Sequence, residues 1–251
     1  MPPAFCEQIA RAVLQAGGVQ SGDLVVEIGP GTGQIGVFLS RSVDYIGLDL
    51  SAGMLDEFRR RLPGRELLNA LLVRADAGRQ WPLADSSARL IFSSRALHLL
   101  PIDHIVSEVF RIAIPGGASL IIGRVERDRT SIRARMAREM MQRLRLRGFE
   151  AHQGEHQTKE LTEACRLRGA QVLEPVAVAK WLVSTAPRQS IESWRLLKGL
   201  GGVPVPRPIR DRILNELEVW ADQNLGGLDA RAESSETYVL RALRIPAATG
   251  D

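Results

Sequence analysis

The sequence is poor in cysteine and has no long apolar run. Its 251 residues include two cysteines, Cys6 and Cys165. Two cysteines cannot build a disulfide framework, and we interpret them as reduced, buried thiols. No apolar run approaches the ~20 residues needed to cross a bilayer, and the N-terminal stretch MPPAFCEQIARAV has no basic segment followed by an apolar core. These absences predict a cytoplasmic protein without a membrane span.

Lysine is also scarce. Lys159, Lys180 and Lys198 are the only lysines among 33 basic residues, and the net charge is +4. Such a bias towards arginine is better explained by genome composition than by function, so the basic balance alone does not imply nucleic-acid binding. The apolar fraction of 45% and the charged fraction of 25% are typical of a globular protein and exclude a disordered chain.

Short apolar runs alternate with segments of helical periodicity in the first half of the chain. An initial helix is expected over 4–16. Buried strands are then expected over 24–29, 43–50, 67–76, 88–94 and 118–123, with helices over 33–41, 51–62 and 102–113. Strands that are apolar on both faces and separated by helices indicate a parallel sheet covered on both sides. The sequence therefore predicts a doubly wound α/β fold.

The second half is predicted to be mainly helical. Helices are expected over 124–148, 158–168, 187–198 and 209–220, with a Gly/Pro-rich break over 201–208. Pro175 lies within a strand-like run over 171–183 and places that strand at a sheet edge. The final run, 237–245, is expected to insert antiparallel beside it, giving a seven-stranded sheet.

A glycine-rich loop follows the first predicted strand, in the string VVEIGPGTGQIG (25–36). Glycines there let backbone amides approach a ligand, and the start of a helix favours a negative group. A nicotinamide cofactor would require GxGxxG directly after the strand, but counting from Gly29 the third glycine position holds Gln34. Counted this way the loop is Gly29, Gly31 and Gly33, preceded by the acid Glu27.

Further motifs follow in order. Asp49 begins DLSAGML (49–55), 20 residues beyond Gly29; RADA (74–77) follows the third strand; and 95–122 runs from a Leu-His pair to a Pro-Gly-Gly turn. With these motifs the sequence resembles the class I S-adenosylmethionine-dependent methyltransferases, closely over about 20–125. One departure is the pair Ala88-Arg89, where most members carry Phe-Asp before the fourth strand.

The resemblance implies a Rossmann-like methyltransferase fold, S-adenosylmethionine as cofactor and S-adenosylhomocysteine as product. It implies that the loop holds the amino-acid end of the cofactor, that Asp49 binds the ribose hydroxyls, and that Asp76 binds the adenine amino group. The implied cofactor-binding residues are Glu27, Gly29, Gly31, Gly33, Asp49, Leu50, Met54, Asp76, Ala77 and Ser93.

Three residues are candidates for the substrate side. His98 is a candidate general base, because the Leu-His pair faces the substrate in relatives; a packing role is the alternative. Arg95 is able to pair with an acidic substrate group or to lie in solvent. Trp194, with Trp181 and Trp220, belongs either to a substrate lid or to the core of the added helices.

Two other signals point elsewhere. HQGEH (152–156) matches a zinc-protease string, but that motif needs a helix, and Gly154 between Gly148 and Thr158 favours a loop; no metal site is expected. Nine arginines over 124–147 would attract phosphate or a membrane, although a solvated helix face explains them better.

We therefore expect one domain: a cofactor-binding core over 1–123, a helical insertion over 124–157, a core helix and edge strand over 158–183, a helical lid over 184–233, and a final strand and tail over 234–251. The expected activity is methyl transfer to an O, N or C nucleophile of a small molecule. An RNA methyltransferase, a nicotinamide-dependent oxidoreductase and a cofactor-binding protein without turnover are the alternatives.

Overall fold

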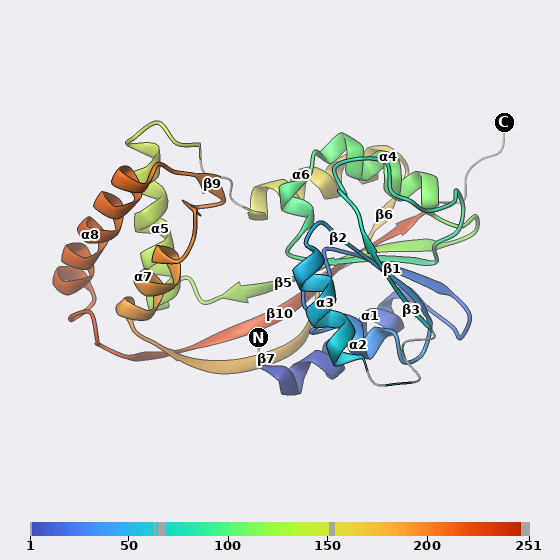
Figure 1. Cartoon of the computed structure of the whole chain (residues 1–251), viewed down its shortest axis with the longest axis horizontal. Helices are drawn as coiled ribbons and strands as arrows, with labels where there is room; N and C mark the ends of the chain where they lie inside the picture. The colour runs from blue at the N-terminus through green and yellow to red at the C-terminus, as the bar shows by residue number, and fades with distance from the viewer. Residues whose placement is uncertain (1, 63, 65–68, 151–153, 247–251) are drawn as a thin grey trace. The chain divides into compact units, whose positions relative to one another are not determined.

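A computed structural model describes residues 2–62, 64, 69–150 and 154–246 (Figure 1). The chain forms two compact units. The first comprises Met1–Arg124, Gln157–Ala179 and Tyr238–Asp251, and the second comprises Val125–His156 and Lys180–Thr237. Within the described ranges, no helix is both long enough and apolar enough to cross a membrane. The scheme of one domain with two helical insertions remains a prediction.

An eight-stranded, mostly parallel sheet is built in the order β3-β2-β1-β4-β5-β10-β6, and β7 also pairs with β10. Neighbours from β3 to β5 run parallel, and β10 is antiparallel to β6. The doubly wound fold is therefore confirmed, with the final strand placed as expected. The strands are β1 (Leu24–Ile28), β2 (Asp44–Asp49), β3 (Ala70–Arg74), β4 (Leu90–Ser94), β5 (Ala118–Arg127), β6 (Gln171–Val172), β7 (Val176–Thr185) and β10 (Ala232–Ile245).

The predicted edge strand over 171–183 is two strands. The amide of Leu173 still donates to the carbonyl of Ala242 at 3.0 Å, but Pro175, which has no amide hydrogen, lies in the gap between β6 and β7. This interruption is the reason that the sheet has eight strands where the sequence predicted seven.

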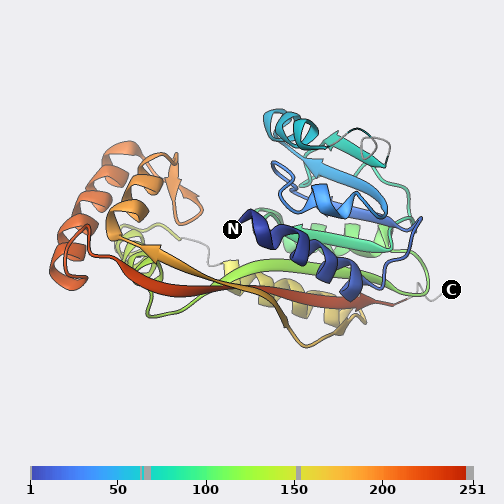
Figure 2. The same ribbon diagram turned by 90° about the horizontal axis from the view of Figure 1, so that it is seen from below.

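Helices cover both faces of the sheet. On one face lie α1 (Cys6–Gly17), which continues the short turn η1 (Pro3–Phe5), α2 (Gly36–Leu39) and α3 (Ala52–Arg61); Figure 2 shows α1 in front of the sheet. On the other face lie α4 (Ile102–Ile112) and α6 (Gly154–Leu167). The central strands β1 and β4 and the first part of β5 are buried between two helical layers, which explains their continuous apolar runs.

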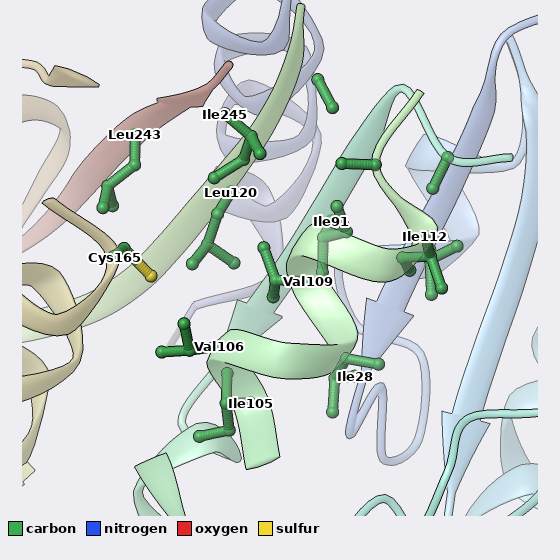
Figure 3. Close-up of a cluster of buried hydrophobic side chains, with 14 of the residues drawn as sticks. Ile28, Ile91, Ile105, Val106, Val109, Ile112, Leu120, Cys165, Leu243 and Ile245 are labelled. Atoms are coloured by element: carbon green, nitrogen blue, oxygen red, sulfur yellow. The ribbon is translucent and has the colours of Figure 1, made fainter. Parts of the chain in front are cut away.

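The apolar stripe of α4 packs on the sheet. Ile105, Val106 and Val109 of the helix belong to one buried cluster with Ile28 and Leu120 of the strands (Figure 3). Burying each of them contributes roughly 1.5–3 kcal/mol to folding. This packing holds α4 against the sheet and with it the turn η3 (Leu97–Leu99), which precedes the helix.

The unusual pair before β4 is accommodated locally. Ala88 is fully buried and forms a parallel bridge with Ala113. Arg89 donates from Nη1 to the carbonyl of Gly117 at 3.0 Å and lies 3.5 Å from the carboxylate of Asp23. The departure from the family pattern therefore leaves β4 in its expected place.

The predicted helix over 124–148 was wrong at its start. β5 continues to Arg127, because β10 begins at Ala232 and the amide of Asp128 still reaches the carbonyl of Ser235. The helix α5 (Ile132–Arg145) begins only after Ser131, whose side chain accepts a hydrogen bond from the amide of Ala134.

The second unit has its own core between α5, α7 (Pro187–Arg195) and α8 (Arg207–Asn224). A hairpin of β8 (Gly199–Leu200) and β9 (Val203–Pro204) fills the predicted break. The buried members of this core are Ile132, Met136, Met140, Leu144, Ile191, Leu200, Val205, Ile213, Leu214, Leu217 and Ala221.

Candidate cofactor site

The glycine loop turns at the end of β1 in a conformation that only glycine adopts freely. Gly29, Gly31 and Gly33 have φ angles of +70°, +57° and +73°. A Cβ at Gly29 would collide with Ala96, and one at Gly33 would collide with the ring of Phe58. The loop is therefore packed closely against its neighbours, and its glycines carry no side chains that would cover the backbone amides.

Asp49 links the end of β2 to this loop. Its Oδ2 accepts a hydrogen bond from the amide of Gly31 at 2.9 Å, and its Oδ1 accepts one from the amide of Ser51 at 2.9 Å. A carboxylate has about four acceptor positions, so two remain for further donors. An anionic, half-buried acceptor thus lies at the carboxyl edge of the sheet, next to the glycine loop.

Glu27 is buried in the first strand, with 2% of its surface exposed. Its Oε2 accepts a 2.6 Å hydrogen bond from the hydroxyl of Tyr45 on β2. Burial raises the pKa of Glu27 to about 7, and the charge of Asp49 adds to this rise while the Tyr45 hydrogen bond opposes it. Burial likewise holds the pKa of Tyr45 well above its ordinary value.

Sequence reasoning missed the two aromatic residues that support the loop. The rings of Tyr45 and Phe58 meet edge to face with centroids 5.8 Å apart, and both would be struck by a Cβ at Gly36. Tyr45 stands inside a predicted strand and Phe58 inside a predicted helix, but neither position by itself indicated a contact with the loop.

Apolar side chains lie exposed beside Asp49. Leu50 is 66% exposed and Met54 is 46% exposed. Ser51 caps α3 by accepting a hydrogen bond from the amide of Met54 at 3.3 Å, which fixes the start of that helix. The arrangement offers an apolar surface next to a carboxylate, as a nucleoside would require.

The segment after β3 carries the third acid. Asp76 is exposed, accepts from the amide of Gly78 at 2.9 Å, and lies 3.6 Å from Arg79. The carbonyl of Ala77 contacts the indole nitrogen of Trp81 and the Nε2 of His104, both at 3.0 Å. These contacts fix the backbone while leaving the carboxylate of Asp76 accessible.

The end of β4 completes this edge of the sheet. Ser93 is fully buried and donates to the carbonyl of Ile28 at 2.8 Å, so β4 is tied to β1. The hydroxyl of Tyr238 on β10 donates to Ser94 at 2.7 Å, a contact that sequence reasoning also missed. Arg95 is exposed and has φ of +68°, a strained backbone for a residue with a side chain.

His98 follows in η3 and is half-buried. Burial, and then the charge of Arg95, lower the pKa of His98 below the ordinary value. The imidazole therefore stays neutral at pH 7 and is able to accept a proton.

The three tryptophans of the second half pack into the second unit. Trp181 is buried and its indole nitrogen donates to Glu236 at 3.2 Å. Trp194 and Trp220 are partly buried against the core of that unit. This packing agrees with the core interpretation; a lid role for Trp194 remains a prediction.

The expectation of a loop around HQGEH was wrong in part. The helix α6 begins at Gly154. Its apolar residues Leu161 and Cys165 are buried in the core next to the sheet, and this packing stabilises the helix. His152 lies outside the described residues, and His156 is exposed. Among the described residues, no group of three or more His, Cys, Asp and Glu side chains is placed to hold a metal. Metal-independent turnover stays a prediction.

Comparison with known proteins agrees with this arrangement. Residues 25–117 match the family model of a methyltransferase domain. No curated protein sequence matches the chain. The YcgJ protein from Bacillus subtilis is similar in fold, with a TM-score of 0.60 and 16% identity over 95% of this chain and 98% of that one. A proposed methyltransferase from Bacillus halodurans gives a TM-score of 0.58 and 16% identity over 95% and 99% of the two chains.

A third similar structure is the geranyl diphosphate C-methyltransferase of Streptomyces coelicolor, solved with Mg²⁺, geranyl diphosphate and S-adenosylhomocysteine. Its TM-score is 0.53 and its identity is 16%, over 94% of this chain and 76% of that one. The match over 25–117 and the similarity in fold support a class I S-adenosylmethionine-dependent methyltransferase.

Proposed function

We propose that this protein binds S-adenosylmethionine at the carboxyl ends of β1 to β4 and transfers its methyl group to an O, N or C nucleophile of a small molecule. The contact between Asp49 and the amide of Gly31 carries this proposal, since it sets an anionic acceptor for a ribose diol beside a bare backbone loop.

The remaining cofactor contacts follow from position. Glu27, Gly29, Gly31 and Gly33 would hold the methionine end, with Glu27 acting through the loop that it supports. Leu50 and Met54 would flank the adenine, Asp76 and Ala77 would receive its amino group, and Ser93 would lie near the methionine portion.

The antiparallel β10 separates this fold from the classical nicotinamide-binding sheet. That sheet has the strand order 3-2-1-4-5-6, whereas here β10 enters between β5 and β6. The loop spacing at Gly33 and Gln34 points the same way.

When held by Asp49 and the glycine loop, S-adenosylmethionine would supply an activated methyl group on a sulfonium for direct displacement by the nucleophile, leaving S-adenosylhomocysteine as the product. The contribution of the protein is alignment and exclusion of water. His98 would accept a proton from an oxygen or nitrogen nucleophile, and Arg95 would pair with an acidic group of the acceptor.

A small-molecule acceptor is favoured over RNA by two observations. The string after β4 reads SSRALH (93–98), without the catalytic Asn-Pro-Pro-aromatic sequence of RNA-modifying relatives. Most of the nine arginines over 124–147 also have internal partners, which leaves little of a continuous basic patch. These partnered residues are Arg127, Arg133, Arg135, Arg138, Arg143 and Arg147.

Calorimetry with S-adenosylmethionine, S-adenosylhomocysteine and NAD tests the proposal. The first two should bind and NAD should not. Asp49→Ala should weaken binding by roughly 1.5–3 kcal/mol, the scale for hydrogen bonds to a charged acceptor. Asp44→Ala, at the exposed opposite end of β2, is the matched control and should leave binding unchanged. A heat of binding with NAD and none with S-adenosylmethionine would overturn the proposed cofactor.

A further inference from the structure

A basic pocket lies within the second unit, between the end of α7 and the first turns of α8. Its volume is about 380 Å³, and it is lined by Arg195, Arg207, Arg210, Asp211 and Asn215. This volume lies within the range of small-molecule sites, roughly 300–1,000 Å³. None of these residues belongs to the cofactor site described above.

The helical repeat of α8 gathers the charges on one side. Arg207, Arg210 and Asp211 stand at positions i, i+3 and i+4, so their side chains share one face of the helix. Arg195, the last residue of α7, faces them across the pocket. The lining therefore holds three guanidinium groups and one carboxylate.

The carboxylate only partly satisfies these arginines. Asp211 lies 3.5 Å from Nε of Arg207 and 3.3 Å from Nη2 of Arg210, both long for charged hydrogen bonds. Within the described part of the chain, this is the one contact of Arg207, whose side chain is 83% exposed. Several of its N–H donors are thus free to meet a ligand.

The other two arginines are held in place. Arg210 donates from Nη1 to the carbonyl of Leu197 at 2.5 Å, and its side chain is 14% exposed. Arg195 donates from Nη2 to Glu218 at 2.6 Å and to Asn215 at 3.3 Å. Because Arg195 and Arg210 are already held at the pocket, an anion would bind them at low entropic cost.

We infer that this pocket binds a phosphate or diphosphate group. Guanidinium groups match phosphate oxygens with paired hydrogen bonds, and the three arginines outnumber the two carboxylates beside them, Asp211 and Glu218, so a net positive charge remains for an anion. The group is either part of a soluble phosphorylated compound or a lipid headgroup.

Titration of the full-length protein with inorganic pyrophosphate, followed by calorimetry and thermal unfolding, tests the inference. Saturable binding and a rise in melting temperature of a few degrees are expected. Arg207→Gln should weaken binding at least fivefold without changing the melting temperature of the free protein. Arg212→Gln, an exposed arginine of α8 outside the pocket, is the matched control and should stay within twofold of the original protein.

The same variants identify the source of the phosphate. Sedimentation with vesicles of phosphatidylglycerol, against vesicles of phosphatidylcholine, detects a headgroup; pyrophosphate binding without vesicle binding assigns a soluble compound. Binding of either probe that Arg207→Gln weakens and Arg212→Gln does not supports the site. No saturable binding, or equal losses in the two variants, would overturn it. The readout needs neither cofactor nor methyl acceptor, so it is independent of the proposed transfer reaction.

Discussion

The hydroxyl of Tyr45 donates a 2.6 Å hydrogen bond to Glu27, which joins β2 to β1 at the base of the glycine loop. Both residues are buried, and a Cβ at Gly36 would lie 2.9 Å from the same Glu27 oxygen. The loop is thus supported by a titratable group, which makes its stability dependent on pH.

Glu27 should destabilise the protein as the pH rises. In the folded chain its pKa is about 7, whereas the unfolded carboxyl titrates near 4.5, so between these values the unfolded state loses a proton that the folded state keeps. The free energy of unfolding falls by about 3 kcal/mol at most over this range. The fall is complete above pH 7. Glu27→Gln, which stays neutral, should gain stability relative to the original protein from pH 4.5 to 7.5 in denaturant titrations.

The control for this change is Glu7→Gln, an exposed acid of α1. It should follow the original protein across the same range. A constant stability difference between Glu27→Gln and the original protein at every pH would contradict the prediction.

Gly33→Ala should destabilise the fold by at least about 2 kcal/mol, because a left-handed alanine costs roughly 1–2 kcal/mol and Phe58 must also move. Gly53→Ala is the matched control: Gly53 lies in α3 with open space around it, and alanine should be neutral or stabilise by up to about 1 kcal/mol. Chemical denaturation of both variants measures the difference, and equal effects would refute the packing argument.

His98 should titrate at a lower pH than an ordinary histidine, because it is half-buried and lies near the charge of Arg95. Replacing Arg95 by Gln removes the second cause and should raise the pKa of His98, so the imidazole gains its proton at higher pH. NMR titration of the ring protons reports both values, with His98→Gln to assign the signal. An unchanged titration in Arg95→Gln would show that the two groups do not interact.

Trp194→Ala tests the proposed lid. We expect cofactor affinity to stay within about threefold while methyl transfer falls at least tenfold, a difference of ~1.4 kcal/mol in the transition state. Trp220→Ala is the control, because Trp220 is also partly buried against the same core. If both variants lose activity and stability in parallel, Trp194 is a core residue and the lid role is wrong.

The sequence by itself determined most of the strand layout of the first unit. The periodicity of the apolar runs placed β1, β2 and β4, and the alternating glycines required a tight turn after β1 because only glycine adopts those φ angles freely. The ribose-binding role of Asp49 was predicted from the family resemblance, whereas its place at the end of β2 was predicted from the apolar run over 43–50.

Tertiary structure decided what depends on contacts between distant segments. The extension of β5 to Arg127 follows from pairing with β10, more than a hundred residues later, and local helical periodicity masked it. The support of the loop by Tyr45 and Phe58, and the gathering of Arg195 with Arg207, likewise arise only when separate elements pack. Local patterns record the backbone conformation that each segment prefers, whereas a contact between segments is set by the packing of the whole chain.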